Sequence, residues 1–208
     1  MLLEDFSDYA IDETQAPEFK GKWSTFYKDQ DFKSIDLEIG TGNGLHFAHR
    51  ATQNPDRLVL GIEIKFKPLI QSIRRARLES ETLNSVMMRF NAYKIEELFS
   101  ENEINNIYIH HPDPWPKKKH WKHRLIQPAY LEKIFKVQKP GSFLDFKTDS
   151  KCYFDWATPI FKNSPYKITR YSEDLHNSDY ASENFVTHFE KIFLRKGQPI
   201  YYARLVKK

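Results

Sequence analysis

Short apolar runs alternate with amphipathic segments along most of this chain. The runs that fit buried strands cover residues 35–39, 58–62, 86–90, 107–111 and 142–147, and two later runs cover 167–171 and 200–206. Between them, the spacing of apolar positions predicts helices over 45–53, 68–80, 128–137 and 153–161. Strands and helices in this order are typical of an α/β fold, with a mostly parallel sheet covered by helices on both faces.

The two ends of the chain depart from this alternation. No clear helix separates the late strands over 167–171 and 200–206, so we expect them to place one antiparallel strand at an edge of the sheet. Residues 1–34 are polar and rich in turn formers, and we expect an N-terminal extension there, followed by one domain over 35–208. In open sheets of this kind, ligands bind outside the carboxyl ends of the strands.

Composition narrows the class of protein. A chain of 208 residues with 40% hydrophobic positions is long and apolar enough to bury a real core. Its single cysteine, Cys152, rules out an internal disulfide. No apolar run approaches the about 20 residues that a bilayer span needs, and the acidic segment 1–12 lacks the order of a signal peptide. We therefore expect a cytoplasmic protein without a membrane partner.

A glycine-rich turn follows the first strand and opens the first helix. It reads E-I-G-T-G-N-G over 38–44, where Gly40 and Gly42 would let a ligand approach the backbone. The spacing lacks the G-x-x-G step of the dinucleotide fingerprint. Glu38 would repel a pyrophosphate but attract the ammonium group of S-adenosylmethionine. The alternative interpretation is an ordinary turn between a strand and a helix.

Polar side chains also follow the next two strands. Glu63 ends the second strand, where its carboxylate can accept hydrogen bonds from both hydroxyls of a ribose. Asn91 follows the third strand, where an amide can face the edge of an adenine. Alone, Glu63 fits a surface acid and Asn91 fits a turn residue. Beside the glycine turn, they favour an adenosine-containing cofactor, which is either a nicotinamide dinucleotide or S-adenosylmethionine.

The segment after the fourth strand carries the strongest signal. Three prolines within 112–116 exclude a helix and fix a loop that would present Asp113 and Trp115. A basic run with interleaved aromatic residues follows, which suits phosphates and unpaired bases. Its cations are Lys117, Lys118, Lys119, Lys122 and Arg124. A solvated charge run is the alternative, and the adjacent His110 and His111 lack a second cluster with metal-ligand spacing, so we predict no metal site.

Five segments of this chain resemble the bacterial tRNA (guanine-N7)-methyltransferase family. They occur in family order and cover the chain from about residue 20 to its end. The D-P-W-P-K run is highly specific, whereas the glycine turn is not. The segments are E-I-G-T-G-N-G over 38–44, G-I-E over 61–63, D-P-W-P-K-K over 113–118, F-K-T-D over 146–149 and T-H-F-E over 187–190.

The resemblance implies a Rossmann-like, seven-stranded methyltransferase sheet that binds S-adenosylmethionine and methylates guanine 46 in the tRNA variable loop. Glu38, Glu63 and Asp113 match positions that bind the cofactor, and Asp113 also matches the family's proposed catalytic residue. Residues that match substrate-contacting positions are Lys117, Asp149, Thr187, His188, Phe189 and Glu190. Lys118, Lys119, Lys122 and Arg124 are the predicted contacts to the RNA backbone.

Two departures from the family pattern stand out. Asn91 occupies a position where the family usually has Asp, and the N-terminus lacks the basic arm common in relatives. The alternatives are a nicotinamide-dependent oxidoreductase, a non-catalytic RNA-binding subunit with the same fold, and a methyltransferase for a small molecule or protein. We expect tRNA as the partner, no obligatory protein partner, and a monomer or homodimer.

Overall fold

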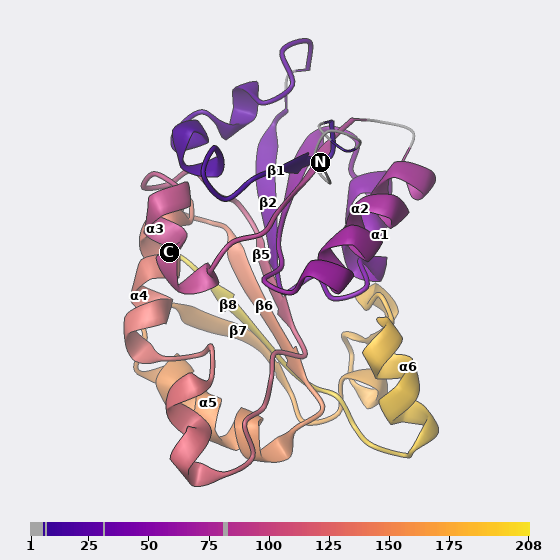
Figure 1. The fold of residues 1–208 in the computed structure, drawn as a ribbon. Coiled ribbons are helices and arrows are strands. Elements are labelled where there is room, and N and C mark those ends of the chain that lie inside the picture. The colour runs from indigo at the N-terminus through magenta and orange to yellow at the C-terminus, as the bar shows by residue number, and fades with distance from the viewer. Residues whose placement is uncertain (1–5, 7, 31, 81–82) are drawn as a thin grey trace.

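The protein is seen in a computed structural model that describes residues 6, 8–30, 32–80 and 83–208. In these residues eight strands form one sheet in the order β1-β4-β3-β2-β5-β6-β8-β7 (Figure 1). The strands are β1 (Ala10–Ile11), β2 (Ser34–Ile39), β3 (Arg57–Ile62), β4 (Ser85–Met88), β5 (Ile107–His110), β6 (Phe143–Thr148), β7 (Lys167–Ser172) and β8 (Tyr201–Val206).

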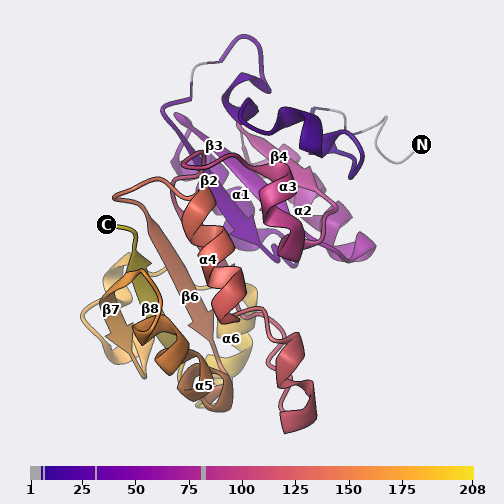
Figure 2. The same cartoon turned by 90° about the vertical axis from the view of Figure 1, so that its left-hand side faces the viewer.

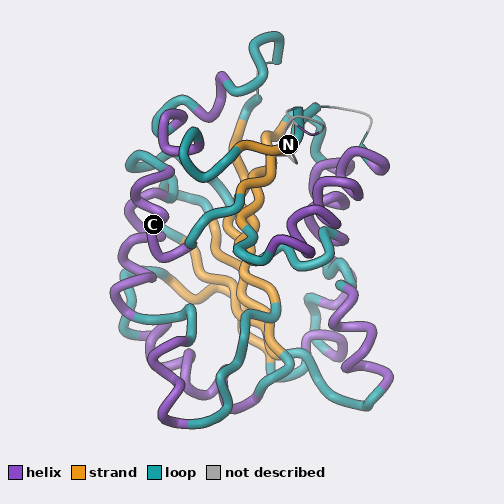
Figure 3. The backbone as a smooth tube through the Cα atoms, viewed as in Figure 1, coloured by secondary structure: helices purple, strands orange, loops and turns teal. Residues whose placement is uncertain are grey.

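Helices cover both faces of the sheet, as the sequence pattern predicts. Helices α3, α4 and α5 lie along one face, and α1, α2 and α6 lie along the other (Figures 1 and 2). The strands form the layer between them (Figure 3). The helices are α1 (Leu45–Gln53), α2 (Phe66–Glu79), α3 (Ile95–Leu98), α4 (Pro128–Val137), α5 (Lys151–Lys162) and α6 (His188–Arg195). Among the described helices, none is long and apolar enough to cross a membrane.

The centre of the sheet is parallel and buried on both faces. All six residues of β2 are buried, and β2 pairs in parallel with β3 from Ser34–Arg57 to Ile39–Ile62. This register places Glu38 directly beside Gly61. A Cβ atom at Gly61 would overlap the side chains of Met87, Phe47 and Thr41, so the absence of a side chain here makes room for them on this face of the sheet. The carboxyl ends of β2 and β3 therefore finish level with each other.

The far end of the sheet has the expected antiparallel pairing. The edge strand β7 pairs antiparallel with β8, which lies between β6 and β7 and also pairs antiparallel with β6. Helix α6 forms between β7 and β8, where we expected no helix. The sheet has an eighth strand because β1, two residues from the N-terminal segment, pairs with β4.

The segment expected as an N-terminal extension packs tightly against the sheet. Trp23 is fully buried, and its indole N–H donates to the carbonyl of Leu98 at 2.8 Å. The Glu103 carboxylate accepts hydrogen bonds from the backbone N–H groups of Gly21 and Trp23. Burying a tryptophan removes one of the largest apolar surfaces from water, so this segment contributes to the core.

Candidate active site

A cleft of about 420 Å³ opens at the carboxyl ends of β2, β3, β4 and β5. Its walls come from five separate stretches of the chain, which the parallel sheet brings to one edge. One wall is formed by the ends of β2 and β3 with the turns that follow them. Another wall is formed by the proline loop after β5 and by the start of α6. The lining residues used below are Glu38, Gly40, Gly42, Glu63, Asn91, Tyr93, His110, Asp113, Trp115, Thr187, His188 and Phe189.

The glycine turn between β2 and α1 has a left-handed backbone at three positions. Gly40, Gly42 and Gly44 have φ angles of 78°, 57° and 76°, which glycine adopts without steric cost. A Cβ atom at Gly44 would lie 2.4 Å from the Cα of Ser72, so the turn can pack against α2 only with glycine there. No atom lies within 4 Å of the Cβ position at Gly40, so the turn is open to a ligand at that point.

Glu38 lies at the base of the cleft and is almost fully buried. Its Oε2 lies 2.8 Å from Nδ1 of His46, in the first turns of α1. The His46 ring contacts the His110 ring at 4.5 Å between centroids. Burial, with Lys147 and His46 nearby, lowers the pKa of His110 well below its usual value, so this imidazole is neutral at pH 7. No sequence motif points to His46, although it follows the glycine turn closely.

Glu63 is held by backbone N–H groups on both of its carboxylate oxygens. Oε2 accepts from Gly42 at 3.2 Å and Oε1 accepts from Lys65 at 2.8 Å. Asn91 also has a local bond, because its Oδ1 accepts from the backbone N–H of Tyr93 at 3.1 Å. The turn interpretation of Asn91 is therefore correct, but its amide nitrogen is not used in this bond. Both residues line the cleft, as the ligand interpretation requires.

The proline loop carries Asp113 and Trp115 to the other side of the cleft. The Asp113 side chain is 70% exposed, and its carboxylate lies 3.8 Å from the Lys65 ammonium group. Trp115 has a φ of 43°, which is uncommon for a residue other than glycine. Its ring contacts His123 at 5.2 Å between centroids. The carboxylate and the indole are therefore both available to a ligand at the cleft.

Arg124 does not lie with the other cations of the basic run. The prediction that it contacts RNA phosphates is wrong, because the side chain is fully buried. Its guanidinium packs against the rings of Trp121, Tyr153 and Trp156 and donates to backbone carbonyls. Lys117, Lys118, Lys119 and Lys122 are exposed, and the last three belong to the short 3-10 helix η5 (Lys118–His123).

The start of α6 forms the remaining wall. Thr187 caps this helix, since its hydroxyl accepts from the backbone N–H of Glu190 at 3.3 Å. His188 and Phe189 line the cleft, and the Phe189 side chain is 47% exposed. Glu190 is different, because it is completely buried below the helix. The structure therefore gives Glu190 a supporting position and does not place it among the residues that line the cleft.

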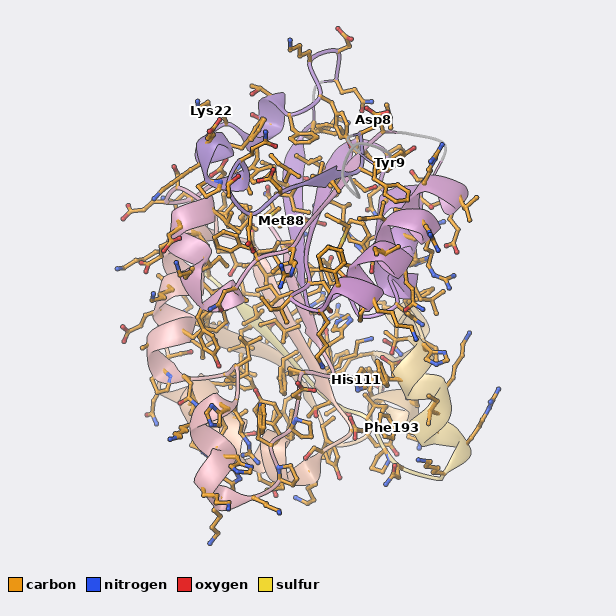
Figure 4. The ribbon with its side chains drawn as sticks, viewed as in Figure 1. Asp8, Tyr9, Lys22, Met88, His111 and Phe193 are labelled. Atoms are coloured by element: carbon orange, nitrogen blue, oxygen red, sulfur yellow. The ribbon has the colours of Figure 1, made fainter. Side chains whose placement is uncertain are left out.

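A buried group of charged and polar residues fixes α6 to the sheet. Lys147 on β6 donates to Glu190 at 2.6 Å and to Asn184 at 2.8 Å. His111 lies 3.3 Å from Asp149 and 3.6 Å from Glu190. Figure 4 shows His111 beside Phe193 of α6, and their rings are 6.0 Å apart. Asp149 contacts His111 and is only partly buried, but it does not line the cleft.

The charged residues in this group shift one another's pKa values. Burial lowers the pKa of His111, but its contacts with the Asp149 and Glu190 carboxylates outweigh burial, and the net shift is upward. Burial raises the pKa of Glu190, but His111, Lys147 and Asn184 outweigh that effect and lower it to about 2. Glu190 is therefore ionised at neutral pH. In the part of the chain that the structure describes, no group of His, Cys, Asp and Glu side chains is arranged to hold a metal ion.

Comparisons with known proteins agree with this geometry. A protein family described as "Putative methyltransferase" matches residues 33–203. A curated tRNA (guanine-N(7)-)-methyltransferase of Bdellovibrio bacteriovorus is 50% identical over 207 residues, which cover 99% of each chain. The curated tRNA (guanine-N(7)-)-methyltransferase of Bacillus subtilis is 33% identical over 204 residues, covering 98% of this chain and 93% of the relative.

Solved structures share the fold at low sequence identity. The aminoglycoside resistance methyltransferase NpmB1 matches with a TM-score of 0.56 and 15% identity, over 85% of this chain and 88% of the other. A 16S rRNA (adenine(1408)-N(1))-methyltransferase from Catenulisporales acidiphilia matches with a TM-score of 0.57 and 15% identity, over 85% and 88% of the two chains. These likenesses establish the methyltransferase fold, with helices on both faces of a mostly parallel sheet.

Proposed function

Because this chain belongs to the tRNA (guanine-N7)-methyltransferase family, we propose that it methylates N7 of guanine 46 in the tRNA variable loop, with S-adenosylmethionine as the methyl donor. The observation that supports this proposal is the meeting, at one cleft, of two buried carboxylates, an open glycine turn and a proline-fixed acid. Cytoplasmic action on free tRNA follows from the same proposal.

The residues of the cleft fit S-adenosylmethionine. From the described residues, Glu63 accepts one backbone hydrogen bond on each oxygen, so both oxygens retain acceptor sites for ribose hydroxyls. The turn at Gly40 leaves open space beside Glu38, whose negative charge would attract the ammonium group. Asn91 would offer its amide to the adenine. When bound, the cofactor supplies an electrophilic methyl group on a positively charged sulfur.

The acceptor nitrogen needs no base. N7 of neutral guanine carries a lone pair and no proton, so no residue of this chain would have to remove a proton before methylation. The purine would carry a positive charge once it is methylated at N7. Asp113 would stabilise that developing charge if the bound RNA excludes water around its exposed carboxylate. The protein's remaining task is to align N7 with the methyl carbon.

The rest of the cleft would hold the nucleotide. Phe189 is exposed at the cleft and would stack on the extruded base, with Thr187 and His188 beside it. Asp149 lies behind His111 and outside the cleft lining, and its partly exposed carboxylate would be the remaining acid for the guanine N1 and N2 donors, since Glu190 is buried and bonded to Lys147. The exposed lysines 117, 118, 119 and 122 would neutralise phosphates of the variable-loop region.

Methyl transfer from labelled S-adenosylmethionine tests this proposal. We expect label to enter unmodified tRNA with guanine at position 46 and not tRNA with adenine there. Chain cleavage at N7-methylguanine should then map the label to that nucleotide. Label at another guanine would contradict position 46 but would leave the proposed methylation of guanine N7 intact. If S-adenosylmethionine binds but no label enters tRNA, the proposal that tRNA is the substrate would be wrong.

A further inference from the structure

Arg124 is a buried cation that donates to the loop carrying Asp113. Its Nε donates to the carbonyl of Pro114 at 2.9 Å, and its Nη2 donates to the carbonyl of Trp115 at 3.4 Å. These two carbonyls belong to the residues that follow Asp113 directly. The planar guanidinium group therefore holds the proline loop through two hydrogen bonds next to Asp113.

Three aromatic rings hold the guanidinium in place. Its Cζ lies 4.5 Å from the ring centroid of Trp121, 4.9 Å from that of Tyr153 and 5.1 Å from that of Trp156. A cation over aromatic faces is stabilised electrostatically, and more so where water is excluded. Tyr153 and Trp156 belong to α5, and Nη1 also donates to the carbonyl of Cys152 in that helix at 3.4 Å. Arg124 thus connects the loop to a rigid element of the fold.

The loop needs such a connection because its backbone is strained. His111 and Trp115, on either side of Asp113, have φ angles of 50° and 43°. Non-glycine residues keep this conformation only when their surroundings over-determine it. Arg124 supplies one of those contacts at the Trp115 carbonyl. The backbone carbonyl of Arg124 accepts a hydrogen bond from the Tyr93 hydroxyl at 3.1 Å. This bond connects Arg124 to the wall of the cleft beside Asn91.

We propose that Arg124 is a positioning residue for methyl transfer, which acts from its aromatic cradle by fixing the Asp113–Trp115 loop relative to the bound nucleotide. The inference rests on the proposed function. It assigns Arg124 a role unlike that of its neighbours in the basic run, since a covered guanidinium cannot neutralise a phosphate. Arg124 would affect the alignment of the reacting atoms, whereas the exposed lysines would affect the affinity for tRNA.

The substitution Arg124→Lys separates these roles, because lysine keeps the charge but lacks the planar fork. We expect kcat to fall roughly 10- to 100-fold, as for a misplaced catalytic group. The KM for tRNA and the Kd for S-adenosylmethionine should stay within about twofold, since uniform binding is untouched. The slope of log affinity for tRNA against log salt should not change. The matched variant Lys122→Ala should instead reduce that slope by about 0.7 to 0.9.

Hydrogen exchange of the unliganded protein gives a second readout that needs no activity. The hydrogen-bonded backbone amides at the two ends of the loop, those of His111 and His120, should exchange faster in Arg124→Lys than in the unsubstituted protein. Trp156→Leu removes one ring of the cradle, lies outside the cleft, and should produce the same changes to a smaller extent. If Arg124→Lys fails to fold, Trp156→Leu decides the question by the same measurements.

Any of three outcomes for Arg124→Lys would overturn the inference. These are an unchanged kcat, unchanged hydrogen exchange of the loop amides, or a smaller dependence of tRNA affinity on salt concentration. An unsubstituted protein that transfers no methyl group to tRNA would contradict the proposed function instead. In that case loop exchange would still decide whether Arg124 holds the Asp113–Trp115 segment.

Discussion

The two halves of the cleft are held by different kinds of contact. The half proposed to bind the cofactor, called the cofactor half, lies at the ends of β2 and β3 and is fixed by the glycine turn and by backbone bonds such as those from Gly42 and Lys65 to Glu63. The half proposed to bind the RNA, called the substrate half, is formed by the proline loop and α6 and is fixed by buried charged side chains. Arg124 holds the loop, and Lys147 holds α6 through Glu190.

This difference determines how each half should respond to substitution. A buried charge that loses its partner is strongly destabilising, because the remaining charge stays away from water. The Glu63 carboxylate lines the cleft and is bonded to backbone N–H groups instead of a buried cation, so a neutral amide in its place should mainly lose affinity for the ligand. We therefore expect substitutions in the cofactor half to weaken the binding of S-adenosylmethionine. Substitutions of the buried charges beneath the substrate half should instead lower the free energy of unfolding.

The largest effect should come from Lys147→Met, which leaves the Glu190 carboxylate buried without its ammonium partner. We expect the free energy of unfolding to fall by about 3 to 5 kcal/mol, measured by urea denaturation. Lys151→Ala is the matched control, since it removes an exposed pair with Asp155 and should change the free energy of unfolding far less. Equal losses in the two variants would contradict the comparison.

The same buried pair should make stability depend on acid pH. The pKa of Glu190 is lowered to about 2 in the folded protein, from an ordinary value of 4.5. A carboxyl group shifted in this direction contributes stability above its unfolded pKa and loses it as the pH falls through the folded pKa. Stability should therefore decline from about pH 4.5 toward pH 2, and Glu190→Gln should flatten that decline in urea titrations at each pH. An unaltered pH profile would be inconsistent with the buried pair.

Asp113→Asn should lower kcat without lowering stability. Loss of one electrostatic stabiliser of a transition state typically costs roughly 100- to 1000-fold in kcat. The exposed side chain makes little contribution to the fold, so the unfolding free energy should change by less than about 0.5 kcal/mol. Single-turnover transfer to tRNA measures the first quantity. Full turnover at saturating substrates would show that Asp113 does not act on the reacting atoms.

Glu63→Gln should have the smallest of these effects, and it should change only the binding of S-adenosylmethionine. Losing charged hydrogen bonds to a ribose corresponds to about 1.5 to 3 kcal/mol, so the Kd for S-adenosylmethionine should rise by roughly 10- to 100-fold. Saturating cofactor should restore kcat. A calorimetric titration with the cofactor alone measures the shift, and an unchanged Kd would remove Glu63 from the proposed site.

Sequence patterns predicted the cofactor half well because its determinants lie close together in the chain. The predicted helices over 45–53 and 128–137 match α1 and α4 to the residue. The turn over 38–44 and Glu63 then follow from where parallel strands must end. Cofactor contacts themselves stay predictions, but the residues named for them lie at one cleft.

The substrate half depends on contacts between residues far apart in the sequence. Arg124 looked like part of a solvated basic run, since nothing local shows that Tyr153 and Trp156 would cover it. Helix α6 was missed although Thr187 and Glu190 form a helix-capping pattern at its start. The residue that anchors it, Lys147, lies far away in the sequence on β6. Strand β1 has only two residues and exists through its pairing with β4. Local spacing carries no signal for such long-range contacts.

The placement of β8 between β6 and β7 constrains the order in which the chain can assemble. Both neighbours precede β8 in the sequence, so the space between them must stay open until β8 has been made. The pairing of β7 with the sheet runs entirely through β8, from Lys167–Val206 to Ser172–Tyr202. Because β8 is made after both of its neighbours, this end of the sheet can be completed only last. On the ribosome, the nascent chain would therefore complete its glycine turn well before it could build the wall that is proposed to receive RNA.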